Sequence, residues 1–254
     1  MSPVTCPTLR IHPAVLAQAT ASVAALAEEK SGFPRFGFGV GTGEALNEHI
    51  FGDAWPSADV RLEMLEESLQ VIRALWGGET VDHRGKHYTV ENARLYTLPA
   101  TTPLVYVSAF GPKAADVAAR TGDGLMTVGA QADIRTAYRA AGGTGASHSS
   151  IKVAWAATEE EGLDNAYRLW PNEGLPGELA QVLPTPTHFE QASQLVTRDM
   201  IGESVACGPD PGKHIAAIQE LVDAGFDEIY VGQIGPDQQG MLDFYSREIL
   251  PHFS

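Results

Sequence analysis

The acid best placed for chemistry follows a glycine-rich segment, FGFGVGTGEALN, at residues 36–47. The segment predicts a strand over residues 36–42 in which alternate positions are glycine, so one face of the strand is bare backbone. Glycine weakens a strand, and a run of it is typical of close approach by a ligand or by another backbone. Glu44 stands at the end of that strand, where α/β folds place their sites. One interpretation is a proton-transferring carboxylate; the other is a tightly packed strand followed by a solvated acid.

These glycines do not form a dinucleotide-binding motif. The pattern G-x-G-x-x-G requires glycine at its sixth position. Counted from Gly39 that position holds Glu44, and counted from Gly37 it holds Thr42. The spacing therefore argues against a Rossmann site.

A second candidate site lies at residues 105–112, VYVSAFGP, which predict a strand, a turn of small residues and the start of a helix. Free backbone N–H groups and the positive end of the helix dipole point the same way at such a junction, which makes it a possible anion site. An ordinary strand-to-helix loop is the alternative, because such loops are common.

The histidines and cysteines give no support to a metal site. His83 and His87 are four residues apart, but Gly85 lies between them in a predicted hairpin, so they do not share a helix face. The sequence holds no H-E-x-x-H motif, and Cys6 and Cys207 form no C-x-x-C pair. No serine stands in a G-x-S-x-G context, so a hydrolase triad has no support either.

The elements that must position these residues alternate between short apolar runs and helical periodicity, which predicts βαβ units and a parallel sheet. Strands are predicted at residues 4–6, 36–42, 104–109, 124–128, 151–157 and 228–232. Helices are predicted at residues 13–28, 60–76, 112–120, 133–141, 159–170, 188–197, 210–224 and 239–250. The remaining segments are predicted as a hairpin turning at Gly85 (80–98), a flexible loop (142–150) and an irregular excursion (171–186). Six such units suit a doubly wound sheet, whereas a closed (β/α)₈ barrel needs eight, so the count leaves both open.

Composition excludes several classes of protein. The chain has 254 residues with 17 Lys+Arg and 32 Asp+Glu, a formal net charge of −15, and 44% hydrophobic residues. This is a globular composition whose acidity argues against nucleic acid and anionic membrane as partners. We expect no membrane span and no signal peptide, because no apolar run is long enough and the first ten residues lack the signal pattern. Two cysteines without a pairing pattern favour a reducing, cytoplasmic compartment.

Several longer motifs resemble the luciferase-like superfamily, in the branch of deazaflavin (F420)-dependent oxidoreductases similar to F420-dependent glucose-6-phosphate dehydrogenase. The motifs are TCPTLRIHPA (5–14), GVGTGEALNEH (39–49), RLEMLEES (61–68), HYTVENARLY (87–96) and GPKAADVAARTGDGL (111–125). The stretches PTPTHFEQA (184–192), CGPDP (207–211), DAGFD (223–227) and QIGPDQ (233–238) fit the same branch. The likeness covers nearly the whole chain.

The resemblance implies an α/β, TIM-barrel-like (luciferase-like) fold, in a single domain over residues 1–254 with surface insertions near 77–100 and 170–200. The chain matches the family from its third strand, so the barrel is expected to be incomplete, with about six βα units and the first two without a counterpart. An incomplete barrel has open edges that must be covered. Dimerisation, rearrangement or sequence absent from this chain could cover them, and we expect a homodimer.

The resemblance also implies roles for particular residues. Glu44 matches the family's catalytic acid. The matched cofactor-binding positions are Val4, Cys6, Thr42, Gly43, Asn47, Ser108, Ala109, Phe110 and Gly111. Phe110 departs from the family pattern, which has glycine there, and a bulky side chain limits how closely backbone approaches a phosphate. The substrate-phosphate Thr and Lys of the glucose-6-phosphate enzyme align near Val128 and Gln131, which cannot replace them.

The expected function is hydride transfer between F420 and a small organic substrate other than glucose 6-phosphate, with Glu44 moving protons. The alternative is a shortened, cofactor-free relative that acts as a cyclase or isomerase, or as a non-catalytic binding protein. A third possibility is a flavin monooxygenase of the same superfamily, which would hold FMN.

Overall fold

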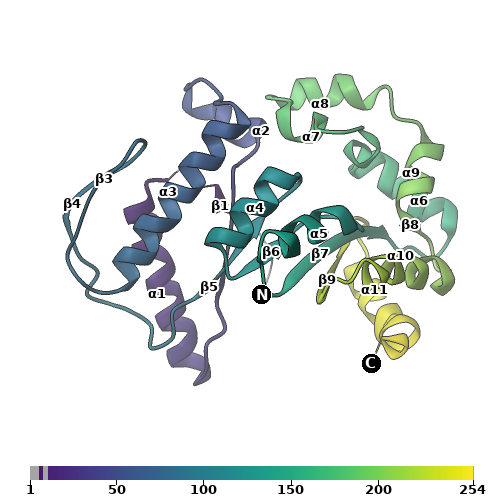
Figure 1. Ribbon diagram of the computed structural model, residues 1–254. Coiled ribbons are helices and arrows are strands. Elements are labelled where there is room, and N and C mark those ends of the chain that lie inside the picture. Colours follow the sequence, from purple (N-terminus) through teal and green to yellow (C-terminus); the bar gives the residue numbers. More distant parts are fainter. Residues whose placement is uncertain (1–5, 8–10, 254) are drawn as a thin grey trace. The chain divides into compact units, whose positions relative to one another are not determined.

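The computed structural model describes residues 6–7 and 11–253. The chain is an α/β protein in which most strands pair in parallel, and it forms two compact units (Figure 1). The first unit comprises Met1–Thr127 and Asp133–Ser147, and the second Val128–Ala132 and His148–Ser254. The α/β class predicted from the sequence is confirmed, whereas the single domain over residues 1–254 stays a prediction.

The first unit contains four parallel strands in the order β1 (Cys6–Pro7), β2 (Gly37–Gly41), β5 (Leu104–Ser108) and β6 (Gly124–Met126). Their register pairs Pro7 with Gly41, Val40 with Val107 and Ser108 with Met126. The carboxyl ends of these strands therefore meet at one edge of the sheet. The predicted strands at 36–42, 104–109 and 124–128 are confirmed with small differences at their ends.

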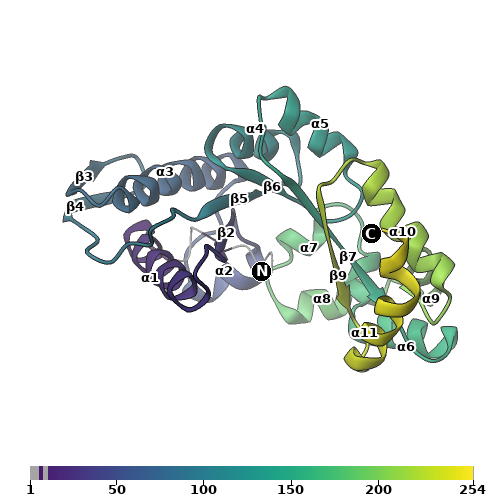
Figure 2. The ribbon, with the colours of Figure 1, turned by 90° about the horizontal axis from the view of Figure 1, so that it is seen from below.

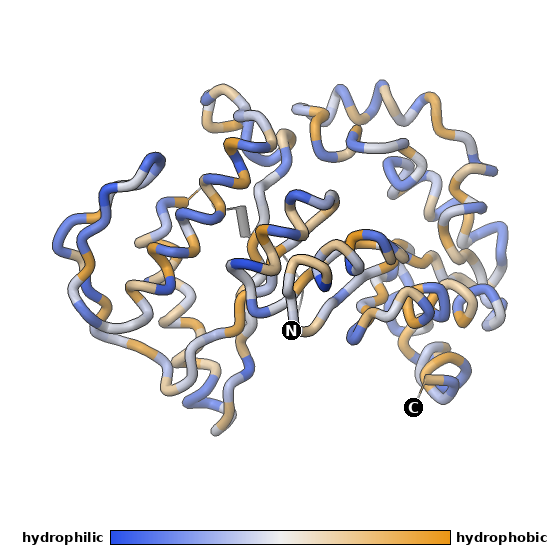
Figure 3. Tube along the Cα trace, viewed as in Figure 1, coloured by the Kyte–Doolittle hydropathy of each residue, from blue (hydrophilic) through white to orange (hydrophobic). Residues whose placement is uncertain are grey.

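The longer helices of this unit are α1 (Pro13–Ser31), α3 (Ala58–Trp76), α4 (Pro112–Thr121) and α5 (Ala132–Ala140). They share a core with the alternate strand residues Phe38, Val40, Val105, Val107 and Leu125. Figure 3 shows hydrophobic and hydrophilic segments alternating along α3, whose buried apolar side chains include Leu65, Leu69, Ile72 and Leu75. The short helix α2 (Ala45–Glu48) and the 3₁₀ turn η1 (His49–Phe51) follow β2, and neither was predicted.

The glycine face of β2 packs against a tyrosine of the neighbouring strand. A Cβ on Gly37 would lie 3.2 Å from the ring of Tyr106, and a Cβ on Gly124 of β6 would lie 2.6 Å from the same ring. Tyr106 therefore lies between two strands that have no side chain beside it. At Gly37 the structure favours packing within the chain over approach by a ligand as the reason for glycine.

The predicted hairpin is confirmed. Strands β3 (Val81–Arg84) and β4 (Thr89–Ala93) are antiparallel, with Arg84 paired to Thr89 around Gly85. The hairpin lies beside α3 (Figures 1 and 2). It occupies most of the predicted insertion at 77–100.

The opposite, amino edge of the same sheet is fixed by one aspartate. The Asp123 carboxylate accepts hydrogen bonds from Arg73 Nη2 of α3 (2.9 Å) and from the Val105 N–H (2.8 Å). Arg73 also donates to the carbonyl of Thr121, the last residue of α4 (3.0 Å). Two helices and two strands are thus joined where β5 and β6 begin.

In the second unit β7 (Ser147–Ala154) pairs in parallel with β8 (Ala206–Cys207) and β9 (Glu228–Gln233). The helices α6 (Glu159–Leu169), α10 (Pro211–Asp223) and α11 (Gln238–Phe244) follow these strands, and a π-helical turn (Tyr245–Ile249) and a 3₁₀ turn (Leu250–His252) follow α11. Between α6 and β8 lie η2 (Pro171–Gly174), α7 (Leu179–Val182), α8 (Pro186–Ser193) and α9 (Arg198–Ser204). Two apolar clusters form the core, one around Val153, Phe244 and Ile249 and one around Ala154, Ile201 and Cys207.

One sequence prediction in this unit is wrong. Residues 147–150 were expected in a flexible loop, but they begin β7 and pair with β9, His148 opposite Glu228. Ser147, His148 and Ser149 are buried although they are polar, so no apolar pattern marked the start of the strand. Ser149 Oγ donates to the Gly129 carbonyl (2.7 Å), 20 residues earlier in the chain. Nor did the sequence indicate β8 or α9. None of the helices described is long and apolar enough to cross a membrane.

Candidate functional site

The carboxyl edge of the first unit's sheet brings two predicted site segments together. Residues 42–44 follow β2, residues 109–111 follow β5, and these two strands are hydrogen-bonded neighbours. Cys6 lies on β1, paired with Val40, so its backbone is one strand further along. Val4, the other residue predicted on that strand, lies outside the described residues. The register therefore places the predicted positions along adjacent strand ends of one sheet.

Glu44 stands at the junction between β2 and α2. Its backbone is extended (φ −130°, ψ 142°) and its carbonyl accepts the N–H groups of Asn47 (3.0 Å) and Glu48 (3.1 Å). Asn47 Nδ2 donates to Glu44 Oε2 (3.3 Å), so the two predicted site residues are directly joined. Gly43 before them has φ +78°, a left-handed conformation that glycine adopts without strain. The side chain of Glu44 is exposed at the sheet edge, where a carboxylate can exchange a proton with a bound molecule.

The segment 108–111 differs from the segment around Glu44 in burial and in its backbone hydrogen bonds. Ala109 is fully buried and its N–H donates to the Met126 carbonyl (2.9 Å), so that N–H is already engaged. The side chain of Phe110 is half exposed. Gly111 precedes α4 and accepts the Ala115 N–H (3.0 Å), and a Cβ added to it would meet nothing within 4 Å. Space for a ligand therefore exists at Gly111, whereas Ala109 contributes no free donor.

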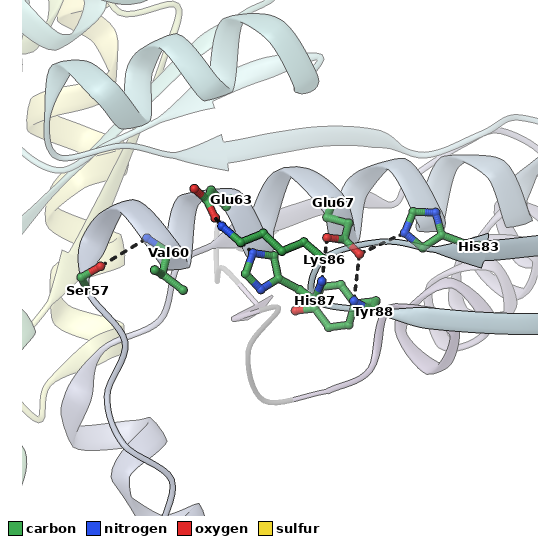
Figure 4. Close-up of polar contacts among 8 residues, drawn as sticks. All are labelled: Ser57, Val60, Glu63, Glu67, His83, Lys86, His87 and Tyr88. Atoms are coloured by element: carbon green, nitrogen blue, oxygen red, sulfur yellow. Dashed lines mark hydrogen bonds and ion pairs between the residues drawn. The ribbon is translucent and has the colours of Figure 1, made fainter.

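A buried carboxylate that the sequence did not single out lies next to the hairpin. Glu67 of α3 accepts hydrogen bonds from the backbone N–H groups of Tyr88 (2.8 Å) and His87 (2.9 Å) and from His83 Nε2 (3.0 Å) (Figure 4). One turn earlier, Glu63 accepts from Lys86 and from His87 Nε2 at the surface. Two of the three donors to Glu67 are backbone N–H groups, which leave no residue-type signal in the sequence.

The environment of Glu67 favours its ionised form. Burial raises the pKa of this carboxyl, but the hydrogen bonds from His83, Tyr88 and His87 outweigh burial, and the net pKa lies below the ordinary value of a glutamate. The exposed Glu63 also has a lowered pKa, chiefly through its hydrogen bond from Lys86. Within the described residues, no group of three or more His, Cys, Asp or Glu side chains is arranged to hold a metal ion.

The comparison with known families identifies the class of protein. Residues 2–228 match the family model of the luciferase-like monooxygenases. The chain belongs to this family. The resemblance inferred from the motifs is confirmed, and so is the assignment to the oxidoreductase class.

Within this family, the chain is similar to enzymes named for F420. The chain is 32% identical over 261 residues to the F420-dependent glucose-6-phosphate dehydrogenase of Nocardia farcinica (strain IFM 10152), covering 96% of this chain and 76% of the relative. It is 31% identical over 261 residues to the F420-dependent glucose-6-phosphate dehydrogenase 2 of Rhodococcus jostii (strain RHA1), covering 96% and 75%.

Solved structures agree with the fold. An F420-dependent secondary alcohol dehydrogenase in complex with an F420–acetone adduct superimposes with a TM-score of 0.83 at 29% identity, covering 98% of this chain and 77% of that chain. The coenzyme F420-dependent tetrahydromethanopterin reductase of Methanopyrus kandleri gives a TM-score of 0.77 at 19% identity, over 99% and 82%. The predicted luciferase-like fold is confirmed. The number of barrel units and the roles of individual residues stay predictions.

Proposed function

We propose that this chain is an F420-dependent oxidoreductase that transfers a hydride between the deazaflavin and a small organic substrate. The observation that carries the proposal is the position of Glu44, exposed at the carboxyl edge of the sheet and joined to Asn47 (3.3 Å), in a chain whose relatives are named for F420. Active sites of parallel α/β folds lie at this edge. Glu44 is the proposed catalytic residue.

The residues at this edge fit a planar cofactor with a phosphate tail. The turn at Gly43 keeps side-chain bulk away from the strand end, and Gly111 stands in open space at the start of α4. Cys6, Thr42 and Asn47 are proposed contacts of the ring, and residues 108–111 of the tail. When bound, F420 supplies or accepts the hydride. Val4 is proposed with Cys6 from the resemblance alone.

The role of the chain's own groups is to orient the substrate and to move one proton. As the substrate carbon gains or loses hydride, its oxygen must gain or lose a proton, and the Glu44 carboxyl is the group proposed to exchange it. Asn47 Nδ2, bonded to Glu44 Oε2, holds the carboxylate in one orientation. Glucose 6-phosphate is not the proposed substrate, because Val128 and Gln131 carry no hydroxyl or cation for a phosphate at the aligned positions.

Titration of the purified chain with F420 and, separately, with FMN, followed by fluorescence, tests the proposal. Micromolar binding of F420 supports it, and alcohols and ketones would then be screened as substrates. Binding of FMN alone would favour the monooxygenase chemistry of other members of the family. A folded chain that binds neither would overturn the proposal.

The engaged N–H of Ala109 and the side chain of Phe110 favour one competing function, a cofactor-free relative that catalyses cyclisation or isomerisation or only binds a partner. The variant Phe110→Gly separates the two. If F420 binds only to this variant, the Phe110 side chain prevents the natural chain from binding the phosphate of the cofactor. If both bind F420 equally, Phe110 does not obstruct the cofactor.

We further infer that the protein acts in the cytoplasm as a homodimer. A reducing compartment suits Cys207, which is a free, buried thiol. Sedimentation or light scattering measures the oligomeric state directly, and a monomer at micromolar concentration would overturn the dimer.

A further inference from the structure

The Glu67 carboxylate fixes the tip of the β3–β4 hairpin against α3. All three of its hydrogen bonds go to the segment around the turn, and a Cβ on Gly85 would collide with the Glu67 carboxylate. Only 9% of Glu67 is exposed, so these bonds replace water as its solvation (Figure 4). The turn is therefore held in one place by a buried anion, and Gly85 is required because the anion occupies the space of a side chain.

The place of the Glu67–hairpin contact along α3 relates it to the candidate site. Helices α1 and α3 follow parallel strands, so both begin at the carboxyl edge of the sheet. Glu63 and Glu67 lie in the second and third turns of α3, counted from Ala58. Glu67 is the tenth of the 19 residues of α3, so the hairpin tip is held beside the N-terminal half of the helix, the half that starts at the edge carrying Glu44.

Tyr88 links the hairpin tip to the start of α1. Its N–H is bound by Glu67 and its side chain is buried. The ring of His12 meets the Tyr88 ring edge-on, with centroids 5.7 Å apart and an interplanar angle of 88°. His12 is the N-cap of α1, where Nδ1 accepts the Ala14 N–H (3.2 Å). A chain of contacts therefore runs from Glu67 through Tyr88 to the residue that starts α1.

We infer that Glu67 is a positioning residue for cofactor binding, acting through Tyr88 on His12, the residue at which α1 starts. The inference rests on the proposed function, in which Cys6 on β1 contacts the deazaflavin. On this inference the β3–β4 hairpin stabilises the position of the cofactor site and is more than a surface insertion. Glu63 supplies the matched control, because it lies four residues earlier on the same helix and holds the same hairpin only through the side chains of Lys86 and His87.

The test uses fluorescence to compare the F420 dissociation constants of the 254-residue chain and its variants. The temperature is chosen from thermal unfolding curves so that each variant is folded. Glu67→Gln places an NH₂ group against backbone N–H donors and is expected to weaken F420 binding about tenfold, which corresponds to ~1.4 kcal/mol. Glu63→Gln is expected to bind as the natural chain does. His12→Asn keeps a capping oxygen for α1 but removes the ring, so we expect an unchanged melting temperature with the same loss of affinity.

A double variant, Glu67→Gln with His12→Asn, tests the route. If both residues act through one path, the double variant loses no more affinity than the weaker-binding single variant. Additive losses, or a Glu67→Gln chain that binds like Glu63→Gln, would overturn the inference while the proposed function stands. Failure of the natural chain to bind F420 would overturn both. If Glu67→Gln does not fold, His12→Asn alone decides, and unchanged affinity there counts against the inference.

Discussion

The ring of Tyr106 occupies the space beside Gly124 on the neighbouring strand, and a Cβ added at Gly124 would lie 2.6 Å from two ring carbons. The same Cβ would lie 2.6 Å from the carbonyl oxygen of Ala146. A shift of the ring alone would not make room for this Cβ, because the Ala146 carbonyl is part of the backbone. The glycine at 124 is therefore a packing requirement of the sheet.

Replacing Gly124 by alanine is expected to destabilise the chain by about 1–3 kcal/mol, because overpacking forces backbone and ring to shift. Urea unfolding measures the change. Gly111→Ala is the control for stability, because a Cβ there meets nothing within 4 Å and the backbone is extended at φ −156°. Equal stability of the two variants would show that Tyr106 can rotate away at no cost.

Glu44→Gln is expected to lower turnover by about 10²–10⁴-fold, the usual contribution of a general acid or base, while F420 still binds. Glutamine keeps the oxygen that can accept from Asn47 Nδ2 but cannot carry the proton. Steady-state kinetics and cofactor titration on the same preparation separate the two effects. Glu29→Gln, at an exposed position of α1, is the control and is expected to be fully active. Normal turnover in Glu44→Gln would remove Glu44 as the acid/base.

His214 makes the stability of the second unit depend on pH. It is fully buried between the Tyr245 hydroxyl (2.8 Å from Nδ1) and the Gly208 carbonyl (2.9 Å from Nε2). A carbonyl only accepts, so Nε2 carries the hydrogen and Nδ1 accepts from Tyr245. Burial lowers the pKa of His214 and outweighs its hydrogen bond to Gly208 and the charge of Asp210.

The buried His214 makes the folded chain less stable at acidic pH. Below the ordinary histidine pKa of about 6.5, the unfolded chain binds a proton at this histidine that the folded chain does not bind. The free energy of unfolding is therefore at its full value above pH ~6.5 and decreases as the pH falls toward the lowered pKa of the folded state. His148, whose pKa burial also lowers, adds in the same direction. His214→Gln is expected to cost about 1–3 kcal/mol at pH 7 and to flatten the decline between pH 7 and 5. Urea midpoints across this range measure both, with the exposed His252→Gln as control. An unchanged slope in His214→Gln would contradict the assignment.

Cys207 is expected to be unreactive in the folded chain. Burial raises its pKa to about 11, so at pH 8 only about one thiol in a thousand is ionised. In a Cys6→Ser variant, which leaves Cys207 as the single thiol, iodoacetamide should label the protein in denaturant but not in buffer. Rapid labelling of the folded variant would show that Cys207 opens to solvent.

The parts of the fold that the sequence predicts well are those with a strong local pattern. The long helices were found because apolar residues recur at helical spacing, as Leu65, Leu69 and Ile72 do. Strand β7 was placed too late because its first residues, Ser147 and His148, are polar yet buried. Such burial depends on partners distant in the chain, here Glu228 on β9, which local periodicity cannot reveal.

In the candidate site, too, some residues could be predicted from the sequence and others could not. Glu44 and Asn47 could be proposed from a glycine strand, its terminal acid and the family resemblance, and the structure joins them directly. Glu67 was missed because its three donors come from residues 16 to 21 positions further along the chain, two of them backbone N–H groups. Backbone donors leave no residue-type signal, so the carboxylate looked like one more charge on an amphipathic helix.

The Arg73–Asp123 contact gives the first unit's sheet two edges with different tolerance for mutation. Cohesion of strands and helices is concentrated where β5 and β6 begin, while Glu44 and residues 108–111 sit where the strands end. Substitutions at the edge that carries Glu44 therefore leave these anchoring contacts intact and are expected to cost little folding free energy. Side chains at that edge, such as Phe110, can therefore vary during evolution without first unfolding the protein.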